Sequence, residues 1–375
     1  MTGRFSHANG VLGLAHAPFN WKYHPGERTI PMLLRDAGYR STLIGMQHED
    51  LDAASLGYDQ VLQVAGNRCV PVAEATERWL LLASPGDAPW FASVGFFETH
   101  RMGSRGYPES EYPRRPANAE HVPKYLPNNE ASREEMAGFH AAVETMDAAV
   151  GRILAAIDSR GLRDQTWVIF TTDHGIAFPG AKSTLSDAGL EVALVMRWPA
   201  GFPGGTVCDE LVSHVDLLPT LLHALGVTKP PALQGSSYWH ALAGRTHPVP
   251  DSIFAEKNHH EGHDPLRAVR TDRWKYIRNY RPNTPMSLPS DVIASQTYRS
   301  TPECWITPRP AEQLYDLLND PSESINLAGS PAHSTVLDEL RGRLAAWMHQ
   351  TDDILPAGSL LVDPPPIESS PSGSI

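Results

Sequence analysis

The sequence lacks the features that mark several classes of protein. No run of about 18 apolar residues occurs among its 375 residues, which argues against a membrane-spanning helix. Lys and Arg number 31 against 43 Asp and Glu, giving a net charge of −12 with no basic stripe, so no nucleic-acid partner is expected. The first residues, MTGRFSHANG, have neither the basic start nor the apolar segment of a signal peptide. The compartment, cytoplasmic or exported, therefore stays open.

Cysteine is also scarce. Cys69, Cys208 and Cys304 are far apart and odd in number, which excludes a disulfide framework and a CxxC metal knuckle. Only Arg68 supplies a basic neighbour to Cys69 in the sequence, so we interpret this cysteine as unreactive. What is present is an ordinary globular composition, 41% hydrophobic and 20% charged, in a chain long enough for two domains.

Up to about residue 248, apolar segments of strand length alternate with amphipathic helical segments. Strands are predicted at 41–45, 90–97, 166–172 and 191–197, and helices at 28–38, 132–159 and 216–225. This alternation predicts an α/β domain of three layers around a mostly parallel sheet, with the 90–97 strand buried on both faces.

The remainder of the chain has a different pattern. Short β segments at 252–255, 267–271 and 274–280, followed by a helix at 337–347, predict a smaller α+β subdomain with an antiparallel sheet. The expected division is a catalytic α/β domain at 1–248, the antiparallel subdomain at 249–355 and a disordered Pro/Ser/Gly-rich tail at 356–375.

Polar side chains follow three of the predicted strands. They are His48, Glu98 with His100, and Asp173 with His174. A lone histidine near a strand end is usually structural, but the carboxyl ends of parallel strands meet at one sheet edge, where ligands bind. Three histidines and two acids are therefore expected to meet in one place.

Two further segments could contribute to this place. An adjacent carboxylate and imidazole, as in Asp173-His174, can be offered to one divalent ion, and Lys182 can return from the following loop with a charge for an anion. Taken alone, Lys182 would be interpreted as a solvated loop lysine. His259, His260 and Glu261 are candidate substrate-binding residues, although adjacent residues of an extended segment point to opposite faces, so at most one histidine should face a site.

Several segments, taken in order, resemble the sulfatase family of the alkaline phosphatase superfamily. These segments are Thr2-Gly3-Arg4, AGYRSTLIGMQH, FFETHR, TTDHG, RAVRTDRWKYIRNY and QLYDLLNDPSESINLA. The last resembles a C-terminal pattern that is among the most specific in the family, and the match covers nearly the whole chain. Within the family, the segments most similar to the heparan N-sulfatases, or sulfamidases, are GLAHAPFN, IPMLLRDAGYRSTLIG, NHHEG and the Thr-Asp-Asp near residue 351.

The resemblance implies an alkaline-phosphatase-like fold and hydrolysis of sulfate esters or N-sulfated glycosaminoglycan sugars. Family members use a formylglycine made from a signature Cys or Ser as nucleophile, with a divalent metal, usually calcium. By motif position, Asp173 and His174 would be metal ligands, His48 would help break down the sulfated intermediate, His100 would protonate the leaving atom and Lys182 would bind sulfate. The implied partner is a small sulfated substrate, such as a saccharide containing N-sulfoglucosamine, and a homodimer is compatible with the sequence.

The sequence departs from the family pattern in two respects. The Cys-x-Pro-Ser-Arg signature and an earlier Asp-Asp metal pair are absent, so this chain holds no nucleophile, and Cys69 lacks the surrounding signature. Met46 stands where the family has a lysine. We therefore expect little turnover and a gap in the sheet where a buried parallel strand would lie. The hypothesis is that the polypeptide begins upstream of Met1, and in-frame upstream codons without the signature would contradict it.

Two alternatives remain at this stage. One is a phosphate or phosphonate monoester hydrolase of the same superfamily, because a metal and histidine site accepts tetrahedral anions of either element. The other is a non-catalytic protein that binds sulfated sugars through His100 and Lys182.

Overall fold

A three-stranded parallel sheet forms the first part of the molecule. The computed structural model describes residues 1–82, 88–113, 122–245 and 250–355. Strand β1 (Arg40–Gly45) lies between β2 (Gln60–Leu62) and β3 (Trp90–Gly95), and both neighbours run parallel to it. The expected strands at 41–45 and 90–97 are thus confirmed, whereas β2 was not predicted.

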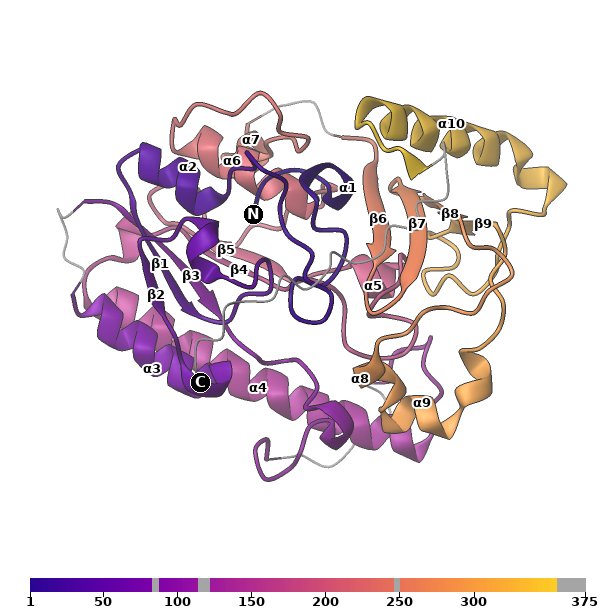
Figure 1. Cartoon of the computed structure of the whole chain (residues 1–375), viewed down its shortest axis with the longest axis horizontal. Coiled ribbons are helices and arrows are strands. Elements are labelled where there is room, and N and C mark those ends of the chain that lie inside the picture. The colour runs from indigo at the N-terminus through magenta and orange to yellow at the C-terminus, as the bar shows by residue number, and fades with distance from the viewer. Residues whose placement is uncertain (83–87, 114–121, 246–249, 356–375) are drawn as a thin grey trace.

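Helices cover both faces of this sheet (Figure 1). Helices α3 (Cys69–Leu80) and α4 (Glu130–Ser159) lie on one side, and α2 (Ile30–Asp36) and α6 (Leu217–Ala224) lie on the other. On the α2/α6 side, Leu34 and Leu222 pack with Phe91 of β3. The arrangement is the three-layer α/β fold that the alternating pattern predicts.

A separate two-stranded sheet follows in the chain. Strands β4 (Val168–Thr171) and β5 (Leu194–Arg197) are antiparallel, and among the described residues they share no ladder with β1, β2 or β3. The residues of β3 are all only half-buried, and Val195 in β5 is 63% exposed. The 90–97 strand is therefore half-buried and not fully buried as predicted, and no described strand pairs with its second edge.

The C-terminal part contains an antiparallel sheet with strand order β6-β7-β8-β9. These strands are β6 (Ile253–His259), β7 (His263–Arg270), β8 (Trp274–Asn279) and β9 (Glu312–Asp316). Helix α10 (Ser334–Gln350) covers one face, where Val269 and Leu314 pack against Leu340 and Trp347. The predicted antiparallel sheet and its covering helix are present, and β9 is an addition.

Five short helices complete the described chain. They are α1 (Ser6–Asn9), α5 (Asp187–Leu190), α7 (Trp239–Leu242), α8 (Ser290–Ile293) and α9 (Gln296–Ser300). Helix α3 was not predicted from the sequence; its Pro71 lies in the first turn, where proline is tolerated. The proposed tail at 356–375 lies outside the described residues, and the division at 248/249 stays a prediction. No helix among the described residues is long and apolar enough to cross a membrane.

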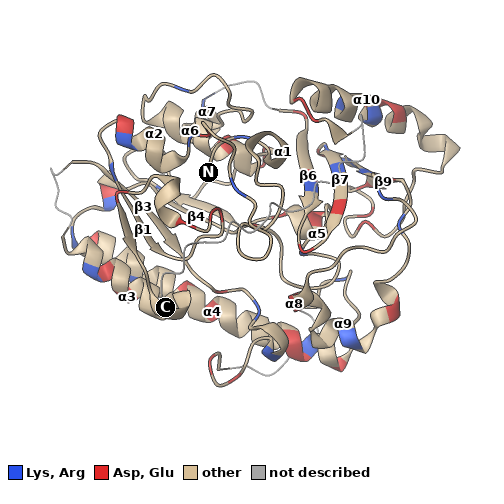
Figure 2. Ribbon diagram, in the orientation of Figure 1, with Lys and Arg blue, Asp and Glu red and all other residues tan. Residues whose placement is uncertain are grey.

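Surface charge is mixed on the helices seen in Figure 2. Both signs of charge occur on each of two helices: α3 carries Glu74, Glu77 and Arg78, and α10 carries Asp338, Glu339, Arg341 and Arg343. On α10, Arg341 pairs with Asp338 at 2.7 Å and Arg343 pairs with Glu339 at 2.8 Å. This interspersion agrees with the sequence, whose acidic balance is spread out and not gathered against one basic surface.

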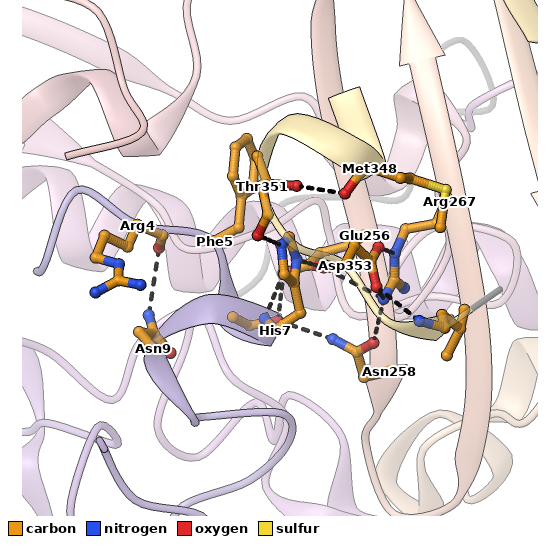
Figure 3. A network of polar contacts seen from close by, with 12 residues as sticks. Arg4, Phe5, His7, Asn9, Glu256, Asn258, Arg267, Met348, Thr351 and Asp353 are labelled. Carbon is orange, nitrogen blue, oxygen red and sulfur yellow. Dashed lines mark hydrogen bonds and ion pairs between the residues drawn. The ribbon is translucent and has the colours of Figure 1, made fainter. Parts of the chain in front are cut away.

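A buried ion network fastens the N-terminal segment to the antiparallel sheet (Figure 3). His7 Nδ1 lies 2.6 Å from Glu256 Oε2, and the His7 Nε2 lies 3.2 Å from the carbonyl oxygen of Thr351. Arg267, which is 1% exposed, binds both carboxylate oxygens of Asp353 and lies 3.6 Å from Glu256. Because Arg267 occupies both oxygens of Asp353 and His7 is bonded to Glu256, we interpret the cluster as a structural network and not as a metal centre.

The pH dependence of stability should report on this network. Burial lowers the pKa of His7, but hydrogen bonding and charge from Glu256 outweigh it, so the pKa is raised above 6.5. The stabilising contribution is then complete below about pH 6.5 and is lost as the pH rises through the folded-state pKa. We expect His7→Gln to reduce the free energy of unfolding more at pH 6 than at pH 9, measured by urea titration. A loss that is equal at both pH values would contradict this explanation.

Candidate functional site

Three strand ends deliver polar side chains to a common cluster. His48 follows β1, His100 follows β3, and Asp173 and His174 follow β4. The pKa of His48 is lowered by burial first and then by the charges of His16, His100 and Lys182, while Asp173 acts in the opposite direction. The side chains are therefore close enough to influence one another, although β4 belongs to a different sheet from β1 and β3.

The centre of the cluster is Lys182. The residue is 4% exposed, and its ammonium lies 3.2 Å from His100 Nε2 and donates a hydrogen bond to Asp291 Oδ2 at 3.0 Å. His100 Nδ1 lies 2.8 Å from the carbonyl oxygen of Arg101, which fixes the ring so that Nε2 faces Lys182. Burial first and Lys182 second lower the pKa of His100. Lys182 is thus a buried cation beside an imidazole and is not a solvated loop lysine.

The pair Asp173-His174 meets part of the requirement for a metal site. His174 Nε2 lies 3.5 Å from Asp173 Oδ2, and His174 Nδ1 lies 2.6 Å from the carbonyl oxygen of Gly175. Donation by Nδ1 leaves the Nε2 lone pair available, as is usual for a metal-bound histidine. The two groups can share one cation, but no third ligand group joins them among the described residues. The residues present fit half of a divalent-metal site.

Gly175 is required by a close approach of two backbone segments. A Cβ placed there would lie 1.8 Å from the carbonyl oxygen of Ala188, and the Gly175 amide donates to Gly189 O at 2.9 Å. Any larger residue would push α5 away from the end of β4. The glycine therefore fixes Asp173 and His174 against α5.

The three residues predicted to bind substrate, His259, His260 and Glu261, lie where β6 turns into β7, and they have different neighbours. His260 lies close enough for Lys182, Asp291 and His174 to influence its pKa, which burial chiefly lowers to about 3. His260 Nδ1 is buried and has no hydrogen-bond partner among the described residues. His259 instead packs against Trp21, with ring centroids 5.0 Å apart. Of the two histidines, His260 is the one beside the cluster.

Glu261 and Glu98 are turned to structural partners. Glu261 accepts hydrogen bonds from the backbone amide of Ser290 at 3.0 Å and from its hydroxyl at 2.8 Å, which holds the start of α8. Glu98 accepts from the amide of Cys69 at 2.7 Å and from Arg68. The expectation that Glu98 joins the cluster is therefore wrong, because its carboxylate is occupied at the start of α3.

The interpretation of Cys69 as unreactive is confirmed. The thiol is buried in the first turn of α3, and burial together with the Glu98 carboxylate raises its pKa to about 11. At neutral pH it is therefore a thiol and not a nucleophilic thiolate.

Sequence reasoning missed Asp291 and His16. Asp291, in α8, lies beside both Lys182 and His100, with its Oδ2 3.8 Å from His100 Nε2. The ring of His16 lies 5.3 Å from that of His48. His16 lies within the GLAHAPFN segment that carries part of the family resemblance, but nothing local in the sequence indicated that it or Asp291 would lie at the ends of β1 and β3.

Comparison with known proteins decides the family. A family model described as Sulfatase matches residues 1–227, and a second, described as N-sulphoglucosamine sulphohydrolase, C-terminal, matches residues 180–289. This chain belongs to the sulfatase family. As a sulfatase-family chain it is 28% identical to human N-sulphoglucosamine sulphohydrolase over 94% of its own length and 80% of that protein. It is also 28% identical to an ulvan-active sulfatase of Formosa agariphila, and the matched region covers 71% of this chain and 52% of that protein.

Solved structures agree on the fold of this sulfatase-family chain. A protein in complex with its substrate D-glucosamine-2-N,6-O-disulfate superposes with a TM-score of 0.72 at 16% identity, covering 96% of this chain and 88% of that one. The phosphonate monoester hydrolase of Agrobacterium radiobacter superposes with a TM-score of 0.63 at 19% identity, covering 93% and 87%. The chain thus has the alkaline-phosphatase-like fold of sulfatase-family hydrolases, as its motifs imply.

Proposed function

We propose that this chain belongs to an enzyme that hydrolyses N-sulfated amino sugars, with N-sulfoglucosamine as the substrate unit. The observation that carries the proposal is the buried Lys182 ammonium 3.2 Å from His100 Nε2. A sulfate bound at Lys182 would place its bridging atom next to a group able to protonate it. The similarity to human N-sulphoglucosamine sulphohydrolase over 94% of the chain supports a sulfamate in preference to other sulfates.

The remaining residues receive roles that follow from their positions. Lys182 would hold the sulfate oxygens, His100 would protonate the leaving nitrogen, and His48 would assist the breakdown of the sulfated intermediate. Asp173 and His174 would hold one side of a divalent ion, calcium by family precedent. When bound, this ion would neutralise negative charge on the sulfate. His260, with its unpartnered Nδ1, would contact the sugar.

The nucleophile is the part of the site that these 375 residues do not contain, since they include no Cys-x-Pro-Ser-Arg segment. A formylglycine would supply the attacking oxygen in the family mechanism. We therefore expect the chain to bind its substrate in a calcium-dependent way and to release sulfate slowly. A chain extended by the codons that precede Met1 in frame should release sulfate rapidly if those codons encode the signature.

The test compares ligands and reactions in parallel. Calorimetric titration with N-sulfoglucosamine, an aryl sulfate and a phosphonate monoester, each with calcium and with a chelator, measures binding preference, and ion chromatography measures sulfate release. Preference for N-sulfoglucosamine supports the proposal. Preference for the phosphonate would favour the monoester hydrolase function, to which the fold is also similar. Binding without release by both the chain and its extension would instead indicate a sulfated-sugar binding protein.

The pKa of His100 should respond to sulfate. In the free protein, burial and the Lys182 charge lower it. A sulfate bound at Lys182 offsets that positive charge, so the pKa of His100 is expected to rise when sulfate binds. NMR titration of the histidine ring signals, with and without saturating sodium sulfate, measures the change. An unchanged pKa in saturating sulfate would show that the anion binds elsewhere.

A further inference from the structure

Asp291 is held firmly at the site by contacts on two sides. Glu261 binds Ser290 at the start of α8, and Glu135 of α4 accepts hydrogen bonds from the Thr297 amide at 3.0 Å and hydroxyl at 2.6 Å in the following helix, α9. The Asp291 side chain is 11% exposed, whereas that of the neighbouring His100 is 37% exposed. The carboxylate is thus pre-organised behind His100, and the imidazole offers an approach from solvent.

The charge of Asp291 is unusual for a pocket that binds sulfate. Burial raises the pKa of the Asp291 carboxyl group. The charges of Lys182 and then His100 lower it by more, so the net pKa lies below its usual value. An anion at this position repels sulfate oxygens and weakens the attraction between Lys182 and the sulfate. Its location is therefore better explained by a positive charge on the other part of the ligand.

We propose that Asp291 recognises the amino nitrogen of the sugar and stabilises the ammonium group that forms there, which makes the site selective for N-sulfates over O-sulfates. This inference rests on the proposed function. The atom protonated by His100 would lie about 3 Å from Nε2, and Asp291 Oδ2 is itself 3.8 Å from Nε2. A nitrogen in that position can reach the carboxylate directly.

The balanced reactions show why a carboxylate discriminates between a sulfamate and a sulfate ester. Hydrolysis of a sulfamate is R–NH–SO3⁻ + H2O → R–NH3⁺ + SO4²⁻. The S–N bond breaks with its electron pair on nitrogen, the water oxygen ends on sulfur, and nitrogen takes up both protons of the water. Hydrolysis of a sulfate ester is R–O–SO3⁻ + H2O → R–OH + SO4²⁻ + H⁺, and the organic product is neutral. Only the first reaction creates a cation beside Asp291.

A simpler role for Asp291 would be to position Lys182. Such a role would affect every sulfated ligand alike, because Lys182 binds the sulfate and not the organic group. The distinguishing quantity is therefore the preference between two sugars that differ only at carbon 2, glucosamine with an ammonium group and glucose with a neutral hydroxyl.

The experiment measures binding of these two sugars by calorimetry in sodium sulfate at pH 6.5. We expect the chain to bind glucosamine at least about tenfold more tightly than glucose, the range of a hydrogen bond to a charged group. Asp291→Asn should abolish the preference, and Asp291→Glu should retain part of it. Asp272→Asn, which removes an exposed carboxylate from the β7–β8 turn, is the matched control and should leave the preference unchanged.

Two results would overturn the inference: no preference in the unaltered chain, or a preference that persists in Asp291→Asn. If Asp291→Glu retains part of the preference, the loss in Asp291→Asn cannot be explained by a folding defect at this position. The readout does not depend on turnover. Failure of sulfate release and of N-sulfoglucosamine binding would remove the proposed function, whereas loss of amine preference with N-sulfoglucosamine binding intact would remove this inference alone.

Discussion

Replacing Lys182 by Met should weaken binding of N-sulfoglucosamine about a hundredfold, which corresponds to about 3 kcal/mol. Two physical effects add in the same direction. The sulfate loses a buried cation, and the Asp291 carboxylate, which accepts from Lys182 at 3.0 Å, is left without that partner and repels the incoming anion. Calorimetric titration measures the change, and circular dichroism checks that the variant is folded.

Matched variants separate this effect from general loss of charge. Lys182→Arg keeps the cation and should bind within about tenfold of the unaltered chain, since guanidinium also pairs with sulfate oxygens. Lys229→Met removes an exposed lysine and should change nothing measurable. If Lys182→Met bound N-sulfoglucosamine normally, the assignment of the sulfate position to Lys182 would be refuted.

The largest effect on stability is expected for Arg267→Met. Arg267 binds Asp353 with two nitrogens and also donates to Asn258 Oδ1 at 2.8 Å and to the carbonyl oxygen of Leu266 at 2.8 Å. Removing it leaves Asp353 and Glu256 as buried carboxylates with one cation fewer. Breaking a buried ion pair from one side costs about 3 to 5 kcal/mol, so the free energy of unfolding should fall by that amount in urea titration.

Two controls test whether burial is the cause. Arg343 also contacts two carboxylates, Asp251 at 2.8 Å and Glu339 at 2.8 Å, but at the surface. Arg343→Met should therefore cost less than about 1 kcal/mol. Adding Asp353→Asn to Arg267→Met should recover part of the loss, because the uncompensated charge is removed. Equal losses for Arg267→Met and Arg343→Met would contradict a special role for the buried network.

Most of the regular structure was predictable from local pattern. The 132–159 segment repeats its apolar residues at helical spacing, and the observed α4 begins only two residues earlier, where Asn129 accepts from the Ser132 amide at 2.9 Å. Errors occurred where pattern is uninformative. Strand β2 has three residues, too few for periodicity, and the antiparallel pairing of β5 with β4 depends on the path of the intervening chain, including α5.

The candidate site divides in the same way. His48, His100, Asp173 and His174 were predicted to meet because each follows an apolar strand, and they do lie near one another although β4 belongs to a different sheet from β1 and β3. The sequence offered Lys182 as a possible charge for an anion, but its burial and its contact with His100 depend on the loop before α5 and could not be predicted. Local pattern predicts where a strand ends, but it does not predict which loop folds back to that end.

The sequence by itself determined the family, the two kinds of sheet and the polar residues at the strand ends, because motifs and hydrophobic periodicity are local properties. Only the tertiary structure decided which charges meet. Asp291 lies 109 residues from Lys182 in the chain, and Glu256 lies 249 residues from the backbone amide of His7. Such pairs form because packing of the helices, loops and sheets brings distant segments together, and the strength of a charge interaction depends on distance in space and not along the chain.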